Sequence, residues 1–333
     1  MPHHTHGMPV AAAAGLLSAL VLSCALSSNA SAQKYPDKPI RLIVQSPAGG
    51  TADLIARVIA QRLGDALGQT VVADNRAGAA GTVSAEITAQ AAPDGYTLLV
   101  ASVSLMAINV TLREGKLTYN PEKDFTHITL TGKVPLAISV LPAFPARTFK
   151  EFIAHAKSRP GKLSYGSAGT GSSNHVVGEL LKTETGIDMI HVPFKGGAPA
   201  MASLLANELD IYIATVPTIV PMVQGGRIRA ITVTSARRSA ALPEVPTIAE
   251  SGLPGFDTTS WFCIVGPRNL PPAIVARLNT EIVKILNNTE VRERLIAAGV
   301  NVESTTPEGL RAFVHAEIAK MRKSVKFSGA TVD

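Results

Sequence analysis

Residues 40–68 read IRLIVQSPAGGTADLIARVIAQRLGDALG, and they predict a strand, a glycine turn and a helix in immediate succession. The β-branched run 40–44 suits a buried strand, and residues 47–50 interrupt it. Apolar residues then recur on one helical face until Gly68, which is a typical helix terminator. A strand followed at once by a helix predicts an α/β fold in which helices cover a largely parallel sheet.

The same alternation continues along the chain in two series. The first series adds strands at 71–72 and 96–101 and a helix at 85–91. The second adds strands at 137–141, 163–167, 191–194, 210–214 and 228–234, and helices at 149–157, at 176–185 and around 201–205. The chain then returns with a strand at 261–265, a helix over 274–286 and a last helix that starts from Thr306 as its N-cap with Pro307 next. Two α/β sets predict two lobes with a ligand cleft between them. We place the first lobe at 33–136, the second at 137–253, and the completion of the first at 254–333.

Residues 1–32 contain no Lys, Arg, Asp or Glu and are rich in Ala, Leu, Val and Ser. The apolar run is too short for a typical membrane span, and Ala30-Ser31-Ala32 is a cleavage site of small residues. We therefore predict a signal peptide cleaved after Ala32 and export to the periplasm. Two alternatives stay open: Met8 as the true start, and lipidation of Cys24.

The charge and the cysteine content exclude several classes. The formal net charge is +6, but basic residues are scattered and aromatic residues make up only 5%, so we expect no nucleic-acid partner. Cys263 is the single cysteine after the leader, so no internal disulfide is expected. The histidines after the leader, at 127, 155, 175, 191 and 315, show no paired ligand spacing, and no metal or cofactor is predicted.

Three turns place backbone N–H groups at predicted helix starts, namely 47–51, 78–82 and 167–173. Glycine allows a ligand to approach the main chain, and a helix N-terminus offers unpaired donors with a partial positive charge. Each turn is therefore a candidate anion site, although glycines can also serve only to make a tight turn.

Neither nucleotide binding nor catalysis has a clear sequence signature. The chain lacks G-x-x-x-x-G-K-[ST] and G-x-S-x-G. Ser172 and His175 are three residues apart and could meet on one helical turn, so a serine hydrolase stays open as an alternative. No third acid that would orient the histidine is visible.

Several longer motifs resemble the extracytoplasmic solute receptors of tripartite tricarboxylate transporters, the Bug family, from Tyr35 to the end of the chain. They are YPDKPIRLIV (35–44), PAGG (47–50), NRAG (75–78), APDGYTLL (92–99), YGSAGTGSSNH (165–175), HVPFKG (191–196) and LPEVPT (242–247). The resemblance implies a two-lobed periplasmic-binding-protein fold of type II. Each lobe would be a mixed sheet flanked by helices, and the lobes would close on a carboxylate.

The resemblance also implies a binding role and not an enzymatic one. The expected partners are a small carboxylate and the membrane permease subunits of a tripartite tricarboxylate transporter, and a monomer is expected. A carboxylate sensor for signalling is an alternative. The ligand-binding residues that the resemblance implies are Ala48, Gly49, Gly50, Asp53, Ser102, Ser104, Ser167, Gly169, Thr170, Gly171, Ser172, His175, Lys195, Gly196 and Thr215.

The chain departs from the family pattern at two places. Ala214-Thr215 stands where related sequences often carry Asp and Asn, and the missing acid argues against an amino acid ligand. Cys263 stands where Gly is common, and we expect a small buried thiol there. Trp261 could either form a wall of the cleft or brace the returning strand.

Overall fold

The computed structural model describes residues 1–4 and 35–331. The predicted cleavage site, Met8 and Cys24 fall within 5–34, so the prediction of a signal peptide lies outside the described residues. Residues 38–331 belong to one compact unit, and the fold described below is that of this unit. In the described ranges, no helix combines the length and the apolar character that a membrane crossing needs.

The first half of the sheet is built around β1 (Ile40–Val44), which lies between β2 (Val71–Asn75) and β3 (Thr97–Ser102), all parallel. Helix α2 (Thr51–Leu67) follows β1 and ends at Gly68, whose φ of 70° suits glycine. The short η2 (Ala79–Gly81) and α3 (Thr82–Ala89) follow β2. The carboxyl ends of all three strands therefore lie at one edge of the sheet.

The second half repeats this arrangement. Strand β5 (Leu163–Ser167) lies between β6 (Met189–Pro193) and β7 (Ile211–Thr215), again all parallel. Helices α6 (Ser173–Thr185), α7 (Gly197–Leu205) and α8 (Val216–Gln224) follow these three strands in turn. Helix α5 (Phe149–Lys157) precedes them and begins with a capping box between Thr148 and Glu151.

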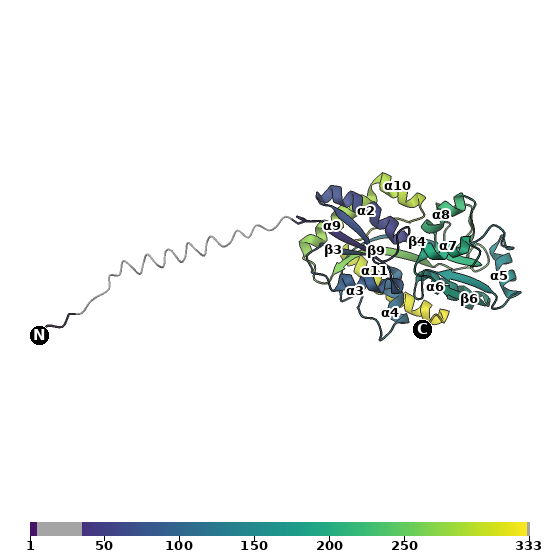
Figure 1. Ribbon diagram of the computed structural model, residues 1–333, viewed down its shortest axis with the longest axis horizontal. Coiled ribbons are helices and arrows are strands. Elements are labelled where there is room, and N and C mark those ends of the chain that lie inside the picture. Colours follow the sequence, from purple (N-terminus) through teal and green to yellow (C-terminus); the bar gives the residue numbers. More distant parts are fainter. Residues whose placement is uncertain (5–34, 332–333) are drawn as a thin grey trace. The chain divides into compact units, whose positions relative to one another are not determined.

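Two long strands connect the halves. β4 (Phe125–Val140) runs antiparallel to β9 (Thr259–Pro267) as far as Pro135, and from Leu136 it pairs with β7 and with β8 (Arg229–Val233). The strand order is β2-β1-β3-β9-β4-β7-β5-β6, with β8 on β4. In Figure 1, α2, α3 and α9 (Pro272–Asn287) surround one half, α5, α7 and α8 surround the other, and β4 and β9 lie between. The sheet is therefore mixed, and the strand predicted at 137–141 is only the last part of a longer one.

Apolar cores stabilise the two halves, and the core of the first half also contains Val176 and Leu180 of α6. In the first half, residues of β3 and β9 such as Leu99 and Cys263 pack against η3 (Ser104–Ile108) and α11 (Pro307–Ser328). In the second half, one core contains Phe152 and Ile213 and another contains Leu204. Helix α4 (Asn109–Leu112) extends η3, while α9 (Pro272–Asn287) and α10 (Thr289–Ala297) precede α11. Thr306 caps α11, as its sequence predicts, by accepting a hydrogen bond from the Gly309 N–H.

Candidate functional site

A cavity of about 700 Å³ lies where the carboxyl ends of the parallel strands from both halves meet. This volume is in the range of small-molecule sites. Six loops supply its walls, one after each of β1, β2, β3, β5, β6 and β7. The lining residues fall at 45–47, 50–52, 77–81, 102, 104 and 113 in the first half, at 168–170, 172–174, 193–197, 212, 215 and 218 in the second, and at 260 and 262 on β9.

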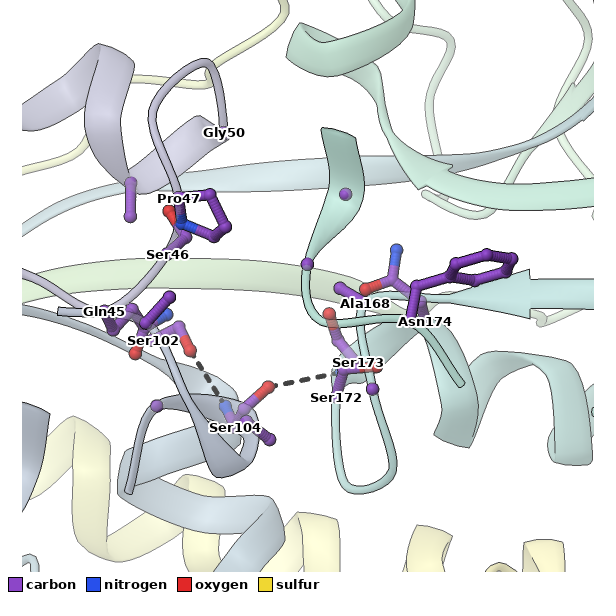
Figure 2. A pocket seen from close by; sticks show the side chains of 18 of the residues that line it. Gln45, Ser46, Pro47, Gly50, Ser102, Ser104, Ala168, Ser172, Ser173 and Asn174 are labelled. Carbon is purple, nitrogen blue, oxygen red and sulfur yellow. Dashed lines mark hydrogen bonds between the residues drawn. The ribbon is translucent and has the colours of Figure 1, made fainter. Parts of the chain in front are cut away.

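The two halves face each other across this cavity. Figure 2 shows the loop from Gln45 to Gly50 on one side and Ala168 to Asn174 on the other, with Ser102 and Ser104 near the base. The Ser173 N–H donates to Ser104 Oγ at 3.2 Å, and the Ser104 N–H donates to Ser102 Oγ at 3.2 Å. These bonds connect the loop that follows β5 to the loop that follows β3.

Five helices begin at the wall of the cavity. Their N-caps are Gly50 (α2), Gly81 (α3), Ser172 (α6), Gly196 (α7) and Thr215 (α8), and each of these residues lines it. Ser172 Oγ accepts a hydrogen bond from the His175 N–H, whereas no described side chain caps the other four helices. Helix N-termini that lack caps leave N–H donors and partial positive charge for a ligand. The geometry therefore favours an anion.

The loop after β2 is under conformational strain. Ala79 and Ala80 have φ values of 46° and 53°, which non-glycine residues rarely adopt. Such strain clusters at ligand sites because the surrounding structure must hold it in place. The loop lines the cavity, as its glycine turn predicts.

Buried polar atoms in the wall lack partners among the described residues. Gln45 Oε1 and Ser46 Oγ are buried with no hydrogen bond, and both residues line the cavity. A buried polar atom without a partner is costly, so a polar ligand is a natural partner for both.

The charges of the wall are all positive. Arg113 and Lys195 line the cavity, and no Asp or Glu of the described residues does so. This composition suits an anion and offers nothing to balance a positively charged amino group. It agrees with the expectation drawn from Ala214, which is buried in an apolar core.

The predicted binding residues divide into two groups. Those that line the cavity are Gly50, Ser102, Ser104, Gly169, Thr170, Ser172, Lys195, Gly196 and Thr215. Those that the structure places outside the lining are Ala48, Gly49, Asp53, Ser167, Gly171 and His175. Several members of the second group support the lining loops.

Asp53 holds the turn after β1 from behind. Its carboxylate accepts hydrogen bonds from the Gly49 N–H at 3.0 Å, from Arg57 at 3.0 Å and from Asn75 at 2.9 Å. Burial by itself would raise the pKa of Asp53, but the hydrogen bonds from Arg57, Gly49 and Asn75 outweigh it and lower the pKa. A permanent charge at this position fixes the turn that carries Pro47 and Gly50.

Ser167 and His175 support the second-half loop through a stack of aromatic rings. Ser167 Oγ accepts from the Gly169 N–H and hydrogen-bonds His191 Nε2 at 2.7 Å. The rings of His175 and His191 stack with centroids 4.1 Å apart. His175 Nδ1 accepts the Gly171 N–H at 3.3 Å. Burial, His175 and Lys182 together lower the pKa of His191 to about 3.

Gly171 faces the first half and not the cavity. Its φ is +86°, and a Cβ at this position would meet the Asn109 side chain, with Leu112 nearby. A bulky residue here would therefore disturb the packing between the halves as well as the loop.

Several lining residues are not among the predicted binding residues. Gln45, Asn174 and Phe194 lie beside predicted residues, and loop proximity could have suggested them. Arg113, Tyr212 and Ser260 come from segments with no glycine turn, and only the tertiary fold brings them to the cavity.

The structure does not favour the hydrolase alternative. The hydrogen bond between Ser172 Oγ and His175 runs to the backbone N–H and is a helix cap. The His175 Nδ1 atom accepts from Gly171 instead of activating the serine. Within the described part of the chain, no group of three or more His, Cys, Asp or Glu side chains could hold a metal ion.

Two residues singled out in the sequence belong to the core. Trp261 is 1% exposed, its indole N–H donates to Glu317 at 2.8 Å, and its ring packs edge-on against Phe313. It therefore braces the returning strand. Cys263 is fully buried, as predicted, and burial raises the pKa of its thiol.

Proteins of known family are similar to this chain over most of its length. Residues 55–329 match the model of the tripartite tricarboxylate transporter family receptor. Protein BugT of Bordetella pertussis is 34% identical over 316 residues, which cover 95% of this chain and 97% of BugT.

Two solved structures are similar over most of the chain. Rpa4515 of R. palustris, solved with adipate, is 35% identical with a TM-score of 0.87, covering 90% of this chain and all of that one. MatC (Rpa3494) of Rhodopseudomonas palustris, solved with bound malate, is 33% identical with a TM-score of 0.82, covering 87% of this chain and all of that one.

Proposed function

Because the chain belongs to the receptor family of tripartite tricarboxylate transporters, we propose that it captures a small carboxylate between its two lobes and delivers it to a membrane permease. The observation that carries this proposal is the convergence of five helix N-termini on one cavity whose charged lining, within the described residues, consists of Arg113 and Lys195. A carboxylate accepts hydrogen bonds from such N–H groups without needing an Arg clamp.

The first carboxylate of the ligand would lie between the turns that follow β1 and β5. Gly50, Thr51 and Ala52 start α2 on one side. On the other side, the Ser172 and Ser173 N–H groups are already donated to the Gly169 carbonyl and to Ser104 Oγ, so α6 would contribute its dipole and the two serine hydroxyls. Two helix dipoles then point at one negative charge. The relatives solved with adipate and malate, which are small organic acids, support a ligand of this chemical class.

We further propose that the boundaries between the lobes lie where the long strands β4 and β9 pass from one half of the sheet to the other. The boundaries would be 33–136, 137–253 and 254–333. The change of partners along β4 between Pro135 and Leu136 supports the first crossing, and the hydrogen bond from the Thr258 N–H to Thr234 O lies near the second. Lobe closure would then bend β4 and β9.

The proposed function also includes a cellular location and protein partners. We infer a periplasmic monomer that meets the permease subunits of a tripartite tricarboxylate transporter and performs no chemical conversion. The family match and the leader composition of residues 1–32 support this reading.

A thermal-shift panel of mono-, di- and tricarboxylates, amino acids and aromatic acids tests the proposal. Ligand at a hundredfold excess over its Kd should stabilise the fold by about 2.7 kcal/mol. At least one carboxylate should raise the Tm, and calorimetry should give one site per chain. The absence of a shift with every acid in the panel would contradict carboxylate capture.

A further inference from the structure

We propose that Arg113 binds a second negatively charged group of the ligand, so that the cavity selects dicarboxylates over monocarboxylates of the same length. This inference rests on the proposed function, because it assumes that the first carboxylate lies at the helix starts. It assigns a specificity role to a residue that carries no glycine-turn signal.

Arg113 reaches the cavity from a separate element. It follows α4, its N–H donates to the Asn109 carbonyl at 2.9 Å, and its side chain lines the cavity. The segment from Ser104 to Arg113 consists of η3 and α4, which follow β3. The guanidinium is therefore supplied by different elements from the turns at 47–52 and 168–173.

The guanidinium lacks a partner among the described residues. Its Nε atom is buried with no hydrogen bond, and no ion pair joins it to a carboxylate in the described part of the chain. The residue is half-buried, so water solvates its charge only in part. Burying an unpaired charge is costly unless a counter-ion is supplied.

Other arginines of this chain show how such groups are normally satisfied. Arg57 pairs with Asp53 at 3.0 Å and Arg41 pairs with Asp74. The Nε of Arg229 is also buried without a partner, but its two Nη atoms donate to three backbone carbonyls. Arg113 differs from these arginines because it faces a cavity and has no acceptor from the described part of the protein. The missing partner is then a group of the ligand.

The described neighbours of Arg113 do not pair with it as counter-ions. Burial raises the pKa of Tyr119 far above neutrality even though the positive charge of Arg113 acts to lower it, so the phenol stays neutral. The Tyr119 hydroxyl donates to the Leu105 carbonyl at 2.9 Å. Glu86, the nearby acid, accepts a hydrogen bond from Thr118 and does not pair with Arg113. The charge therefore remains available to a ligand.

The ligand group that binds Arg113 should be a carboxylate and not a neutral polar group. A guanidinium forms two parallel hydrogen bonds with a carboxylate and gains charge attraction in a partly desolvated site. A monocarboxylate would leave Arg113 unpaired in the closed cleft, which penalises its binding. The cavity wall thus strengthens the binding of a ligand with a second negative charge and weakens the binding of a ligand without one.

Titration calorimetry with chain-length pairs tests this inference: succinate with butyrate, glutarate with pentanoate, and adipate with hexanoate. The wild type should prefer the dicarboxylate of the best-fitting pair by at least about tenfold, as expected for a charge-assisted hydrogen bond. Arg113→Gln should remove most of that preference while changing monocarboxylate affinity by less than about threefold. Arg113→Lys should retain part of it because the charge remains but the paired geometry is lost.

Arg322→Gln is the matched control, because it removes one positive charge from an exposed position on α11. It should leave the preference unchanged, and thermal melts should show that all variants fold. If the wild type binds both members of each pair equally, or if Arg113→Gln weakens both alike, the inference is overturned while carboxylate capture stands. If the wild type binds no carboxylate, the proposed function fails and this inference fails with it.

Discussion

His191 is the residue whose protonation the fold most strongly opposes. Its ring stacks on His175 and, at 4.9 Å, on Tyr165, and it hydrogen-bonds Ser167. Burial, His175 and the charge of Lys182 lower its pKa from 6.5 to about 3. Glu179, which accepts a hydrogen bond from Tyr165 and pairs with Lys182, is an acidic group beside this cluster. The neutral ring is thus part of the structure that holds the loop at 167–172.

The resulting prediction concerns stability between pH 6.5 and pH 3. In this window the unfolded chain protonates His191 and the folded chain does not, so protons favour the unfolded state. The free energy of unfolding should fall as the pH is lowered, by at most about 1.4 kcal/mol per pH unit for this group. Urea denaturation at pH 7, 6 and 5 measures the slope.

His191→Asn should make this slope smaller by removing the protonation site. Part of the slope should remain, because burial and Arg311 lower the pKa of His127 to about 4, which gives the same sign. An unchanged slope in the His191→Asn variant would show that His191 is not the source. Equal slopes in wild type and a His127→Asn, His191→Asn double variant would exclude both.

At the scale of elements, the sequence predicted those helices and strands whose ends are marked by local signals such as caps. The helix at 149–157 and the start of α11 at Pro307 agree with the structure because caps at Thr148 and Thr306 mark them. The first part of β4 was missed because Thr and Lys side chains interrupt its apolar pattern, and they are satisfied by tertiary contacts such as Thr131 to the Phe262 carbonyl. Helix α8 was missed because Pro221 lies inside it.

The site was predictable to a similar extent. Glycine-rich turns in the sequence predict the loops that carry Gly50, Gly81 and Gly169, because a ligand can approach the backbone closely only where side chains are absent. Arg113 has no local signal, since only the path of η3 and α4 brings it to the cavity. The supporting role of Asp53 also depends on Asn75, which is distant in sequence.

Gly169 tests the loop between β5 and α6. Its φ is +121°, it lines the cavity, and an added Cβ would lie 3.1 Å from the Phe194 carbonyl oxygen. Gly169→Ala should weaken carboxylate binding by roughly tenfold, because the backbone must shift at a helix start that faces the ligand. Calorimetry with the best acid of the panel measures the change.

Gly255→Ala provides the matched control for backbone strain. Gly255 has a φ of +84° with nothing within 4 Å of an added Cβ, and it does not line the cavity. The control should lose about 1 kcal/mol of stability with little change in affinity. Equal loss of affinity in both variants would assign the effect to general strain and not to this loop.

At the scale of the whole cleft, the two halves meet around the cavity. Thr51 Oγ1 and Thr215 Oγ1 are hydrogen-bonded at 2.8 Å, and both residues start helices, α2 and α8. Gly196 lies against Pro47, where an added Cβ would be 2.8 Å from the proline ring. These contacts stabilise the closed arrangement, which any opening of the cleft must break.

Thr51→Val should therefore shift the cleft toward an open form. The variant keeps the size of the side chain but loses the hydrogen bond, which is worth about 0.5–1.5 kcal/mol. Affinity should fall about three- to tenfold through faster dissociation, which stopped-flow kinetics can separate from association. Thr185→Val, on α6 away from the cavity lining, is the control. A slower association rate with unchanged dissociation would contradict a role in closure.

Helix α11 couples the two halves at their other side. Its first turns bury Leu310 and Val314 beside β3 and β9, while Met321 and Val325 share the same core with Val176 and Leu180 of α6. Thr183 of α6 also donates a hydrogen bond to the Ser328 carbonyl. One helix therefore contributes to the stability of both halves.

Met321→Ala should destabilise the molecule as a unit. Met321 is 4% exposed, and truncating a buried methionine costs roughly 2–5 kcal/mol. Because α11 packs on both halves, we expect one cooperative unfolding transition at a lower denaturant midpoint, seen equally by Trp261 fluorescence and by far-ultraviolet circular dichroism. Arg322→Gln, one residue further along the exposed face, should leave the midpoint nearly unchanged. Two separated transitions in Met321→Ala, with Trp261 reporting only one of them, would mean that the halves unfold independently and that α11 belongs to the first alone.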